Sequence, residues 1–444
     1  MKQEKFLTPE QACSYLQSEK GEIYRIHNPG YVFPEYDLIP LVPKKKRVNE
    51  LLAVVSDMDG TTTTTEELCL HSLEYMVRSI TGRMEPEQWQ GLDTVKDYPH
   101  IIGNSTTKHV EYLLRKYGDK IQTEAFSLSF LSAVVWTLRF SKDAGRQRDV
   151  FIDLKTFGLE EFVPLVNEIR SIQDERELVV RFARVVEFNT FSRKLRAAIT
   201  IYYHRYHYIL SLIEGENYSR LQEELPFMEA NTRLIAPMPG VGIFLSLIQG
   251  FFTSDDILPY ALKLWKKHPH TTYSQDKEDL YRNNFCYLRR YCSEKPVRSA
   301  IVTSSIYFEA NIVMREVFRI LHEEAEKYPL PPAEKDPLKE AFSDYRNYYA
   351  GFVTATDSSE IRLKPHRDLY CLALHELGLD REDFDKVVGF EDSESGTIAI
   401  RAAGIPLSIA VPFFGTAGHD MQAASMILPG GLLQAIFEYK LFLD

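Results

Sequence analysis

Five apolar residues, Leu51 to Val55, form a short hydrophobic run with no polar alternation. Such a run predicts a β-strand that is buried on both faces, as in the parallel sheets of α/β proteins. It leads into two acids separated by one residue, Asp57 and Asp59, and then into Gly60. Because open α/β sheets bind ligands at the carboxyl ends of their strands, the two carboxylates are expected at a ligand site.

A helical pattern replaces the strand pattern over residues 66–236. Apolar residues recur at helical spacing in 66–80, and the same spacing returns in 159–170, 175–188 and 191–213. The pattern predicts an inserted helical domain. Its Tyr- and His-rich stretch, residues 202–208, would either line a pocket or form a partly buried helix with amphipathic side chains at its boundary.

Two further strands are predicted after the helical region, and each ends in polar residues. The first covers 299–302 and is followed by Thr303, Ser304 and Ser305. The second begins near residue 386 and leads into adjacent acids, Glu391 and Asp392. With the strand at 51–55 they predict an α/β fold, with a doubly wound parallel sheet as the core and a large inserted α-helical cap.

The domain organisation follows from these changes of pattern. Residues 1–49, broken by Asn28-Pro29-Gly30, are expected to be an N-terminal extension with a helix from about Pro9 to Lys20. The remaining segments are the core, 50–65 and 237–444; the helical cap, 66–236; and two expected inserts in the core, near 250–296 and 322–350.

Composition and charge narrow the classes of function. The chain has 444 residues, of which 44% are hydrophobic and 26% charged, as in ordinary globular proteins. Its net charge of -11 argues against nucleic-acid binding and against binding to anionic membranes. Five scattered cysteines have no metal-site or disulfide spacing, and there is neither a hydrophobic signal core nor a run long enough to span a bilayer. A cytoplasmic location is expected.

Four motifs together resemble the haloacid dehalogenase superfamily. They are Asp57-Met58-Asp59-Gly60-Thr61, the strand-end Thr303-Ser304-Ser305, Lys364-Pro365-His366-Arg367-Asp368, and Gly389-Phe390-Glu391-Asp392-Ser393. Within that superfamily, the cap position and the Pro-Gly-Val helix start at Pro239 resemble the phosphoglycolate phosphatase and β-phosphoglucomutase subgroup. The third motif departs from the family pattern at Arg367, where the family has a proline.

The resemblance implies catalytic roles for four residues. Asp57 would be the nucleophile that forms an aspartyl phosphate, and Asp59 would protonate the leaving group and then activate water. Thr303 would hold a phosphoryl oxygen, with help from Gly60, Ser304 and Ser305. Lys364 would neutralise both the nucleophile and the transferring phosphoryl group.

A magnesium site is implied at the same place. Adjacent acids in a low-dielectric cleft repel each other unless a cation lies between them, and carboxylate oxygens suit Mg²⁺. Asp57, the backbone carbonyl of Asp59 and Asp392 would bind the metal, with Glu391 as a direct or water-mediated ligand.

In the cap, residues 103–108 resemble the Gly-x-Ser loop from which related caps contact their substrate. Ser105 or Thr106 would begin a helix as its N-cap, and Lys108 would reach an anionic ligand. The alternative is an ordinary helix start with a solvated lysine.

The expected function is a magnesium-dependent phosphatase, a phosphoric monoester hydrolase that acts on a small phosphorylated metabolite. The alternatives are a phosphosugar mutase of the β-phosphoglucomutase type and a non-catalytic binding protein on the same fold. Mutases of this group have a histidine in the first cap helix, and the matching position here is Cys69. Asp59 argues against a dehalogenase, because dehalogenases lack this second acid.

Overall fold

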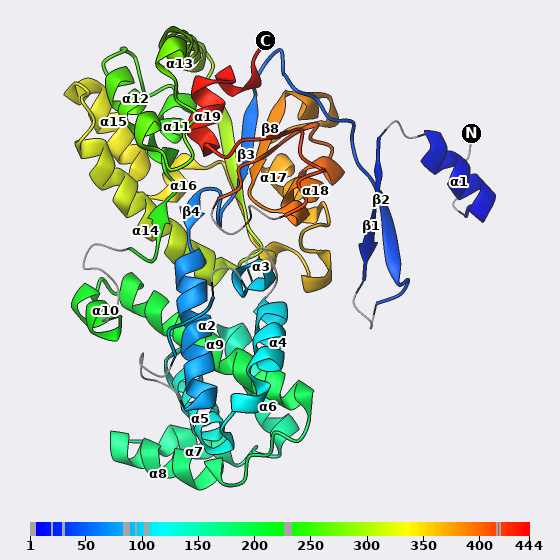
Figure 1. Ribbon diagram of the computed structural model, residues 1–444, viewed down its shortest axis with the longest axis vertical. Coiled ribbons are helices and arrows are strands. Elements are labelled where there is room, and N and C mark those ends of the chain that lie inside the picture. Colours follow the sequence, from blue (N-terminus) through cyan, green and yellow to red (C-terminus); the bar gives the residue numbers. More distant parts are fainter. Residues whose placement is uncertain are drawn as a thin grey trace. The chain divides into compact units, whose positions relative to one another are not determined.

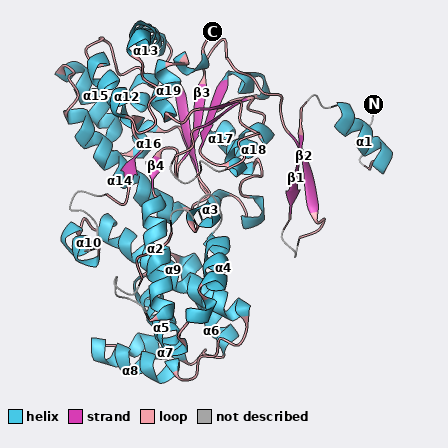
Figure 2. Ribbon diagram, in the orientation of Figure 1, coloured by secondary structure: helices cyan, strands magenta, loops and turns pink. Residues whose placement is uncertain are grey.

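The structure is a computed structural model that describes residues 6–18, 21–28, 32–82, 89–93, 96–101, 106–225, 233–413, 416 and 419–444. The chain forms two compact units, and the second is inserted into the first. The first unit comprises Met1–Thr64 and Ile235–Asp444, and the second is Thr65–Leu234. Figure 1 labels the elements, and Figure 2 shows that the described strands belong to the first unit while the second is helical.

A six-stranded sheet forms the centre of the first unit, and every neighbouring pair in it is parallel. Its order is β10-β9-β8-β3-β6-β7. The chain thus builds outward from β3 on one side, through β6 and β7, and then returns to add β8 beside β3. This reversal of direction next to β3 is the topological switch point of a doubly wound sheet, so the predicted fold class is confirmed. The strands are β3 (Ala53–Asp57), β6 (Arg298–Val302), β7 (Gly351–Val353), β8 (Val387–Glu391), β9 (Leu407–Ala410) and β10 (Met426–Ile427).

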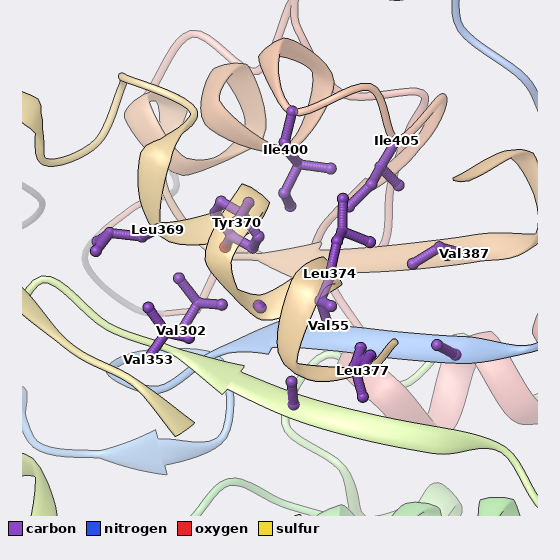
Figure 3. Packing of buried hydrophobic residues seen from close by; sticks show 14 of the residues in the cluster. Val55, Val302, Val353, Leu369, Tyr370, Leu374, Leu377, Val387, Ile400 and Ile405 are labelled. Carbon is purple, nitrogen blue, oxygen red and sulfur yellow. The ribbon is translucent and has the colours of Figure 1, made fainter. Parts of the chain in front are cut away.

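The central strands are apolar because helices cover both faces of the sheet. All five residues of β3 and all five of β8 are buried. On one face, α17 and α18 pack against a cluster that includes Val55, Val302 and Val387 (Figure 3). On the other face, Phe390 of β8 contacts Phe244 of α11, with ring centroids 5.6 Å apart. The helices of this unit, apart from the N-terminal one, are α11 (Val241–Ile248), α12 (Leu258–Lys267), α13 (Glu278–Glu294), α14 (Tyr307–Glu326), α15 (Pro332–Phe342), α16 (Tyr345–Tyr348), α17 (Asp368–Glu376), α18 (Glu394–Ala402) and α19 (Gly431–Phe437).

The two segments that were expected to be inserts in the core are mainly helical. Residues 250–296 contain α12 and α13, and α13 packs against α11 and α19. Residues 322–350 contain the end of α14 together with α15 and α16, and α15 packs against α14.

The N-terminal extension contains the predicted helix and an antiparallel hairpin. Helix α1 (Pro9–Ser18) precedes strands β1 (Ile23–His27) and β2 (Tyr36–Pro40). The buried Arg401 of α18 donates to the carbonyl of Val42 from Nε at 3.0 Å and from Nη2 at 2.9 Å, and so ties the segment after β2 to the core.

A short ladder joins the segments on either side of the inserted unit. Strand β4 (Thr63–Thr64) precedes residues 65–234, β5 (Ala236–Pro237) follows them, and the two strands pair antiparallel. The helices of the inserted unit are α2 (Glu66–Thr81), α3 (Tyr98–Ile101), α4 (Thr106–Lys116), α5 (Thr123–Phe140), α6 (Ala144–Phe157), α7 (Phe162–Glu168), α8 (Ile172–Ala183), α9 (Phe191–Glu214) and α10 (Tyr218–Glu224). Helix α9 packs against α2, α4 and α5 and is central to this unit.

Candidate active site

Asp57 is the last residue of β3, and the loop after it turns sharply back on itself. Gly60 has φ +76°, a backbone conformation that residues with a β-carbon rarely adopt. Its N–H donates to the carbonyl of Thr63 at 2.9 Å. The hydroxyl of Thr62 donates to the backbone carbonyl of Asp57 at 2.7 Å. The loop therefore leaves the Asp57 side chain at the carboxyl end of the central strand, with Asp59 half-buried on the turn.

Lys364 joins Asp57 to Glu391. Its Nζ donates to Asp57 Oδ1 and to Glu391 Oε1, the latter at 2.6 Å, and its side chain is only 6% exposed. Burial works against the charged amine, but the charges of Asp57 and Glu391 outweigh burial and raise the pKa of Lys364. The residue lies in the loop between β7 and α17, and not directly at the end of a strand.

Glu391, the last residue of β8, accepts hydrogen bonds on both carboxylate oxygens. Oε1 accepts from Lys364 Nζ at 2.6 Å and from the hydroxyl of Tyr370 at 3.1 Å. Oε2 accepts from the backbone N–H of Ser393 at 3.1 Å and from its hydroxyl at 2.8 Å. Gly396 lies so close that a β-carbon at this position would overlap the Glu391 carboxylate. The orientation of Glu391 is thus set by the loop after β8, by α18 and by α17.

The donor set at this edge of the sheet fits a magnesium ion. Asp57, Glu391 and Asp392 are buried, and one carboxylate oxygen from each lies within 4.8 Å of the others. Burial and the charge of Glu391 raise the pKa of Asp57 well above its ordinary value, although Lys364 opposes them. Three carboxylates beside the ammonium of Lys364 leave an excess of negative charge, and a divalent cation with oxygen ligands would neutralise it.

Asp59 faces the hydroxyl groups that follow β6. Thr303 and Ser305 both donate their hydroxyl hydrogens to Asp59 Oδ2, each at 3.1 Å. The N–H of Ser305 donates in turn to the oxygen of Thr303 at 2.9 Å, so the hydroxyl of Thr303 both accepts and donates. Ser304 is exposed beside this group. The first two predicted motifs therefore meet through Asp59, Thr303 and Ser305.

The predicted substrate residues of the cap belong to the inserted unit. Thr106 is the first residue of α4 and accepts from the hydroxyl of Tyr203 at 3.3 Å, while Lys108 is exposed. Ser105 lies outside the described residues. Cys69 of α2 accepts a hydrogen bond from the hydroxyl of the buried Tyr202 at 3.5 Å.

The sequence interpretation assigned no role to Tyr370 or Ser393, although both contact Glu391 directly. For Ser393 a signal was present, because a serine just before a helical segment is a favoured N-cap, and its hydroxyl accepts from the N–H of Gly396. For Tyr370 the sequence shows only an aromatic residue in a helix. Which atom its hydroxyl reaches depends on how α17 packs on the sheet.

The strand order and the placement of the motifs decide the type of core. The first, second and fourth motifs follow the adjacent strands β3, β6 and β8, and the lysine of the third reaches the same group of carboxylates. The core is a doubly wound α/β fold whose motifs resemble those of the haloacid dehalogenase superfamily.

Comparison with family models gives no match, and neither does comparison with curated proteins. Among solved structures, CbbY from Rhodobacter sphaeroides in complex with phosphate is 14% identical, with a TM-score of 0.38 over 88% of this chain and 100% of that one. A β-phosphoglucomutase from Clostridium difficile is 12% identical, with a TM-score of 0.36 over 88% and 95%. A HAD-superfamily hydrolase of subfamily IA from Geobacter sulfurreducens is 13% identical, with a TM-score of 0.31 over 87% and 95%.

Proposed function

We propose that this chain is a magnesium-dependent phosphatase that hydrolyses a small phosphorylated metabolite through an aspartyl phosphate on Asp57. The observation that carries the proposal is the ammonium of Lys364 buried between Asp57 and Glu391, with Asp392 beside them, at the switch point of a doubly wound sheet. Phosphoryl transfer needs a nucleophile, a proton donor and concentrated positive charge, and the residues at this position can supply the first two and part of the third.

In the proposed first step, an oxygen of Asp57 attacks phosphorus while the bond from phosphorus to the leaving oxygen breaks, and Asp59 gives that oxygen a proton. In the second step, Asp59 takes a proton from water as the water oxygen attacks the phosphoryl group. Inorganic phosphate leaves and the carboxylate of Asp57 is restored. Lys364 offsets negative charge throughout, since it is buried and fixed by Glu391.

Asp57, Asp392 and the backbone carbonyl of Asp59 are the proposed magnesium ligands, with Glu391 next to them. When bound, the metal supplies positive charge to the equatorial phosphoryl oxygens. Thr303 and Ser305 hold the carboxyl group of Asp59, which carries the proton to be donated, in place before transfer, and Gly60 shapes the turn that carries it. We also propose that Thr303, Ser304 and Ser305 contact the phosphoryl group of the substrate. Thr106 and Lys108 are proposed to contact the rest of the substrate.

A phosphosugar mutase on the same fold is the second candidate. The resemblance places Cys69 where mutases of this group have a histidine, and Cys69 accepts from Tyr202 instead of offering an imidazole. This difference favours hydrolysis.

We also propose a cytoplasmic location, and it is supported by the five cysteines, none of which forms a disulfide among the described residues. No helix among the described residues is long and apolar enough to cross a membrane.

A screen of the full chain against a panel of phosphorylated metabolites, with inorganic phosphate measured in the presence of Mg²⁺, tests the function. We expect phosphate release from at least one sugar or organic-acid phosphate, and loss of that release when EDTA removes the metal. A protein that binds members of the panel but releases no phosphate from any of them would be a binding protein on this fold.

A further inference from the structure

Tyr370 carries a hydroxyl group inside an otherwise apolar cluster. The residue belongs to α17, is fully buried, and lies with Leu369, Val302 and Val353 in Figure 3. Burying a hydroxyl in such surroundings is costly unless it makes a hydrogen bond. The hydroxyl of Tyr370 donates to Glu391 Oε1 at 3.1 Å, so it is directed out of the cluster toward the carboxylates.

The oxygen that accepts from Tyr370 also accepts from Lys364. Glu391 Oε1 lies 2.6 Å from Lys364 Nζ, and the same Nζ donates to Asp57. The ammonium is also 5.3 Å from the centre of the Tyr370 ring. Three hydrogen bonds in series therefore connect Tyr370 to Asp57, through Glu391 and then Lys364.

We propose that Tyr370 is a positioning residue for phosphoryl transfer. Its hydroxyl fixes Glu391 Oε1, and this oxygen in turn holds the ammonium of Lys364 against Asp57. Without the hydroxyl of Tyr370, Oε1 of Glu391 keeps only its hydrogen bond from Lys364, while Oε2 keeps its hydrogen bonds from Ser393. The carboxylate of Glu391 can then turn about Oε2, and the ammonium of Lys364 moves with Oε1. The proposal rests on the proposed function of Asp57 and Lys364.

The hydrogen bond of Tyr370 differs from that of another buried tyrosine in the group that accepts it. Tyr348 of α16 is also buried in this unit, and its hydroxyl donates to the backbone carbonyl of Leu245 at 2.8 Å. Removing either hydroxyl deletes one buried hydrogen bond of a tyrosine. Only the loss at Tyr370 alters the partners of Lys364, so Tyr348 is a matched control.

The test compares Tyr370→Phe with Tyr348→Phe in the full chain. Because a hydrogen bond to a charged group is at stake, Tyr370→Phe should lower kcat about tenfold while KM stays within about twofold of the parent. Tyr348→Phe should leave both constants within about twofold, although it lowers the thermal unfolding midpoint. The proposal is overturned by an unchanged kcat in Tyr370→Phe, or by an equal loss of kcat in the two variants.

A double-mutant cycle with Glu391→Leu, which leaves no acceptor for the Tyr370 hydroxyl, identifies the residue through which Tyr370 acts. If Tyr370 acts through Glu391, adding Tyr370→Phe to Glu391→Leu should lower kcat by less than twofold further. A full tenfold further loss would mean that the hydroxyl acts by another route and would contradict the proposal.

Thermal unfolding of the same four proteins gives a readout that needs no turnover. The decreases in unfolding midpoint caused by the two substitutions should not add in the double variant. Additive decreases would show that the hydrogen bond between Tyr370 and Glu391 does not stabilise the fold, and would contradict the proposal. If the parent releases no phosphate from any substrate, the proposed function fails, whereas the unfolding cycle still reports on Tyr370 and Glu391.

Discussion

Asp57 must be ionised to attack phosphorus, and its surroundings act in opposite directions. Burial and the charge of Glu391 raise the pKa of its carboxyl group, while Lys364 lowers it. The sequence interpretation expected Lys364 to neutralise both the nucleophile Asp57 and the transferring phosphoryl group. The structure shows that the ammonium of Lys364 is shared between the carboxylates of Asp57 and Glu391. The position of Glu391 therefore affects how the ammonium is placed beside Asp57.

Replacing the nucleophile tests the chemistry directly. Asp57→Asn has nearly the same shape but is a poor nucleophile, so hydrolysis of p-nitrophenyl phosphate should fall by a factor of about 1,000 or more. Circular dichroism should show an unchanged fold. Phosphatase activity near the parental level in this variant would sink the assignment of Asp57.

Replacing a proposed ligand tests the metal. Asp392→Asn removes one buried carboxylate from the group of three, so the Mg²⁺ concentration for half-maximal activity should rise about tenfold or more. The control is Asp385→Asn, since Asp385 is an exposed acid whose partner is Lys45. A magnesium requirement that shifts equally in both variants would remove Asp392 from the site.

At the scale of elements, the Tyr- and His-rich stretch of α9 contributes side chains to the interior of the inserted unit. Arg205 is buried and donates from Nε to His71 Nε2 of α2 at 3.1 Å. It also donates to the carboxylate of Glu224 of α10 at 2.8 Å and to its backbone carbonyl at 3.0 Å. Three helices are therefore joined by one arginine, and of the two interpretations of this stretch the partly buried helix describes it better.

His71 gives this arrangement a pH dependence. Burial and the positive charges of Arg205 and Arg78 lower its pKa to about 3, although Glu224 opposes them. An unfolded histidine titrates near pH 6.5, so protonation favours the unfolded chain as the pH falls from about 6.5 toward 3. The contribution of neutral His71 to stability is complete above about pH 6.5 and is lost progressively below it.

The variant His71→Gln keeps a hydrogen-bond acceptor for Arg205 but does not titrate. Between pH 7 and pH 5 the parent should lose about 2 kcal/mol more unfolding free energy than this variant, as measured by urea denaturation. The exposed His375 provides the control, and His375→Gln should follow the parent. Identical pH profiles for the parent and His71→Gln would show that His71 does not carry this dependence.

At the scale of the whole molecule, the question is whether water or a second hydroxyl group receives the phosphoryl group. Cys69 in place of the mutase histidine leads us to expect phosphate release in proportion to substrate consumed, with no stimulation by a sugar bisphosphate. Parallel assays of free phosphate and of isomerised hexose phosphate measure this. Isomerised product that depends on added bisphosphate, with little free phosphate, would identify a mutase and leave the roles of Asp57 and Lys364 intact.

The sequence by itself determined the core strands and the residues that end them. The run from Leu51 to Val55 predicts a buried strand, and the structure has the buried strand β3 two residues further along, from Ala53 to Asp57. The segments before Thr303 and before Glu391 behave in the same way. These features follow from short-range rules, because hydrophobic runs, glycine turns and strand-end acids lie within a few residues of one another.

Only the tertiary structure decided which side chains contact each other. Thr303 was expected to face a phosphoryl oxygen, and its hydroxyl donates to Asp59. Glu391 was expected mainly near the metal, and it accepts four hydrogen bonds, including those from Lys364 and Tyr370. The sequence could not show the contacts that Thr303, Lys364 and Tyr370 make, because these contacts join residues that are far apart in the chain. Their geometry is set by how α17 and α18 pack on the sheet and by which rotamers that packing allows.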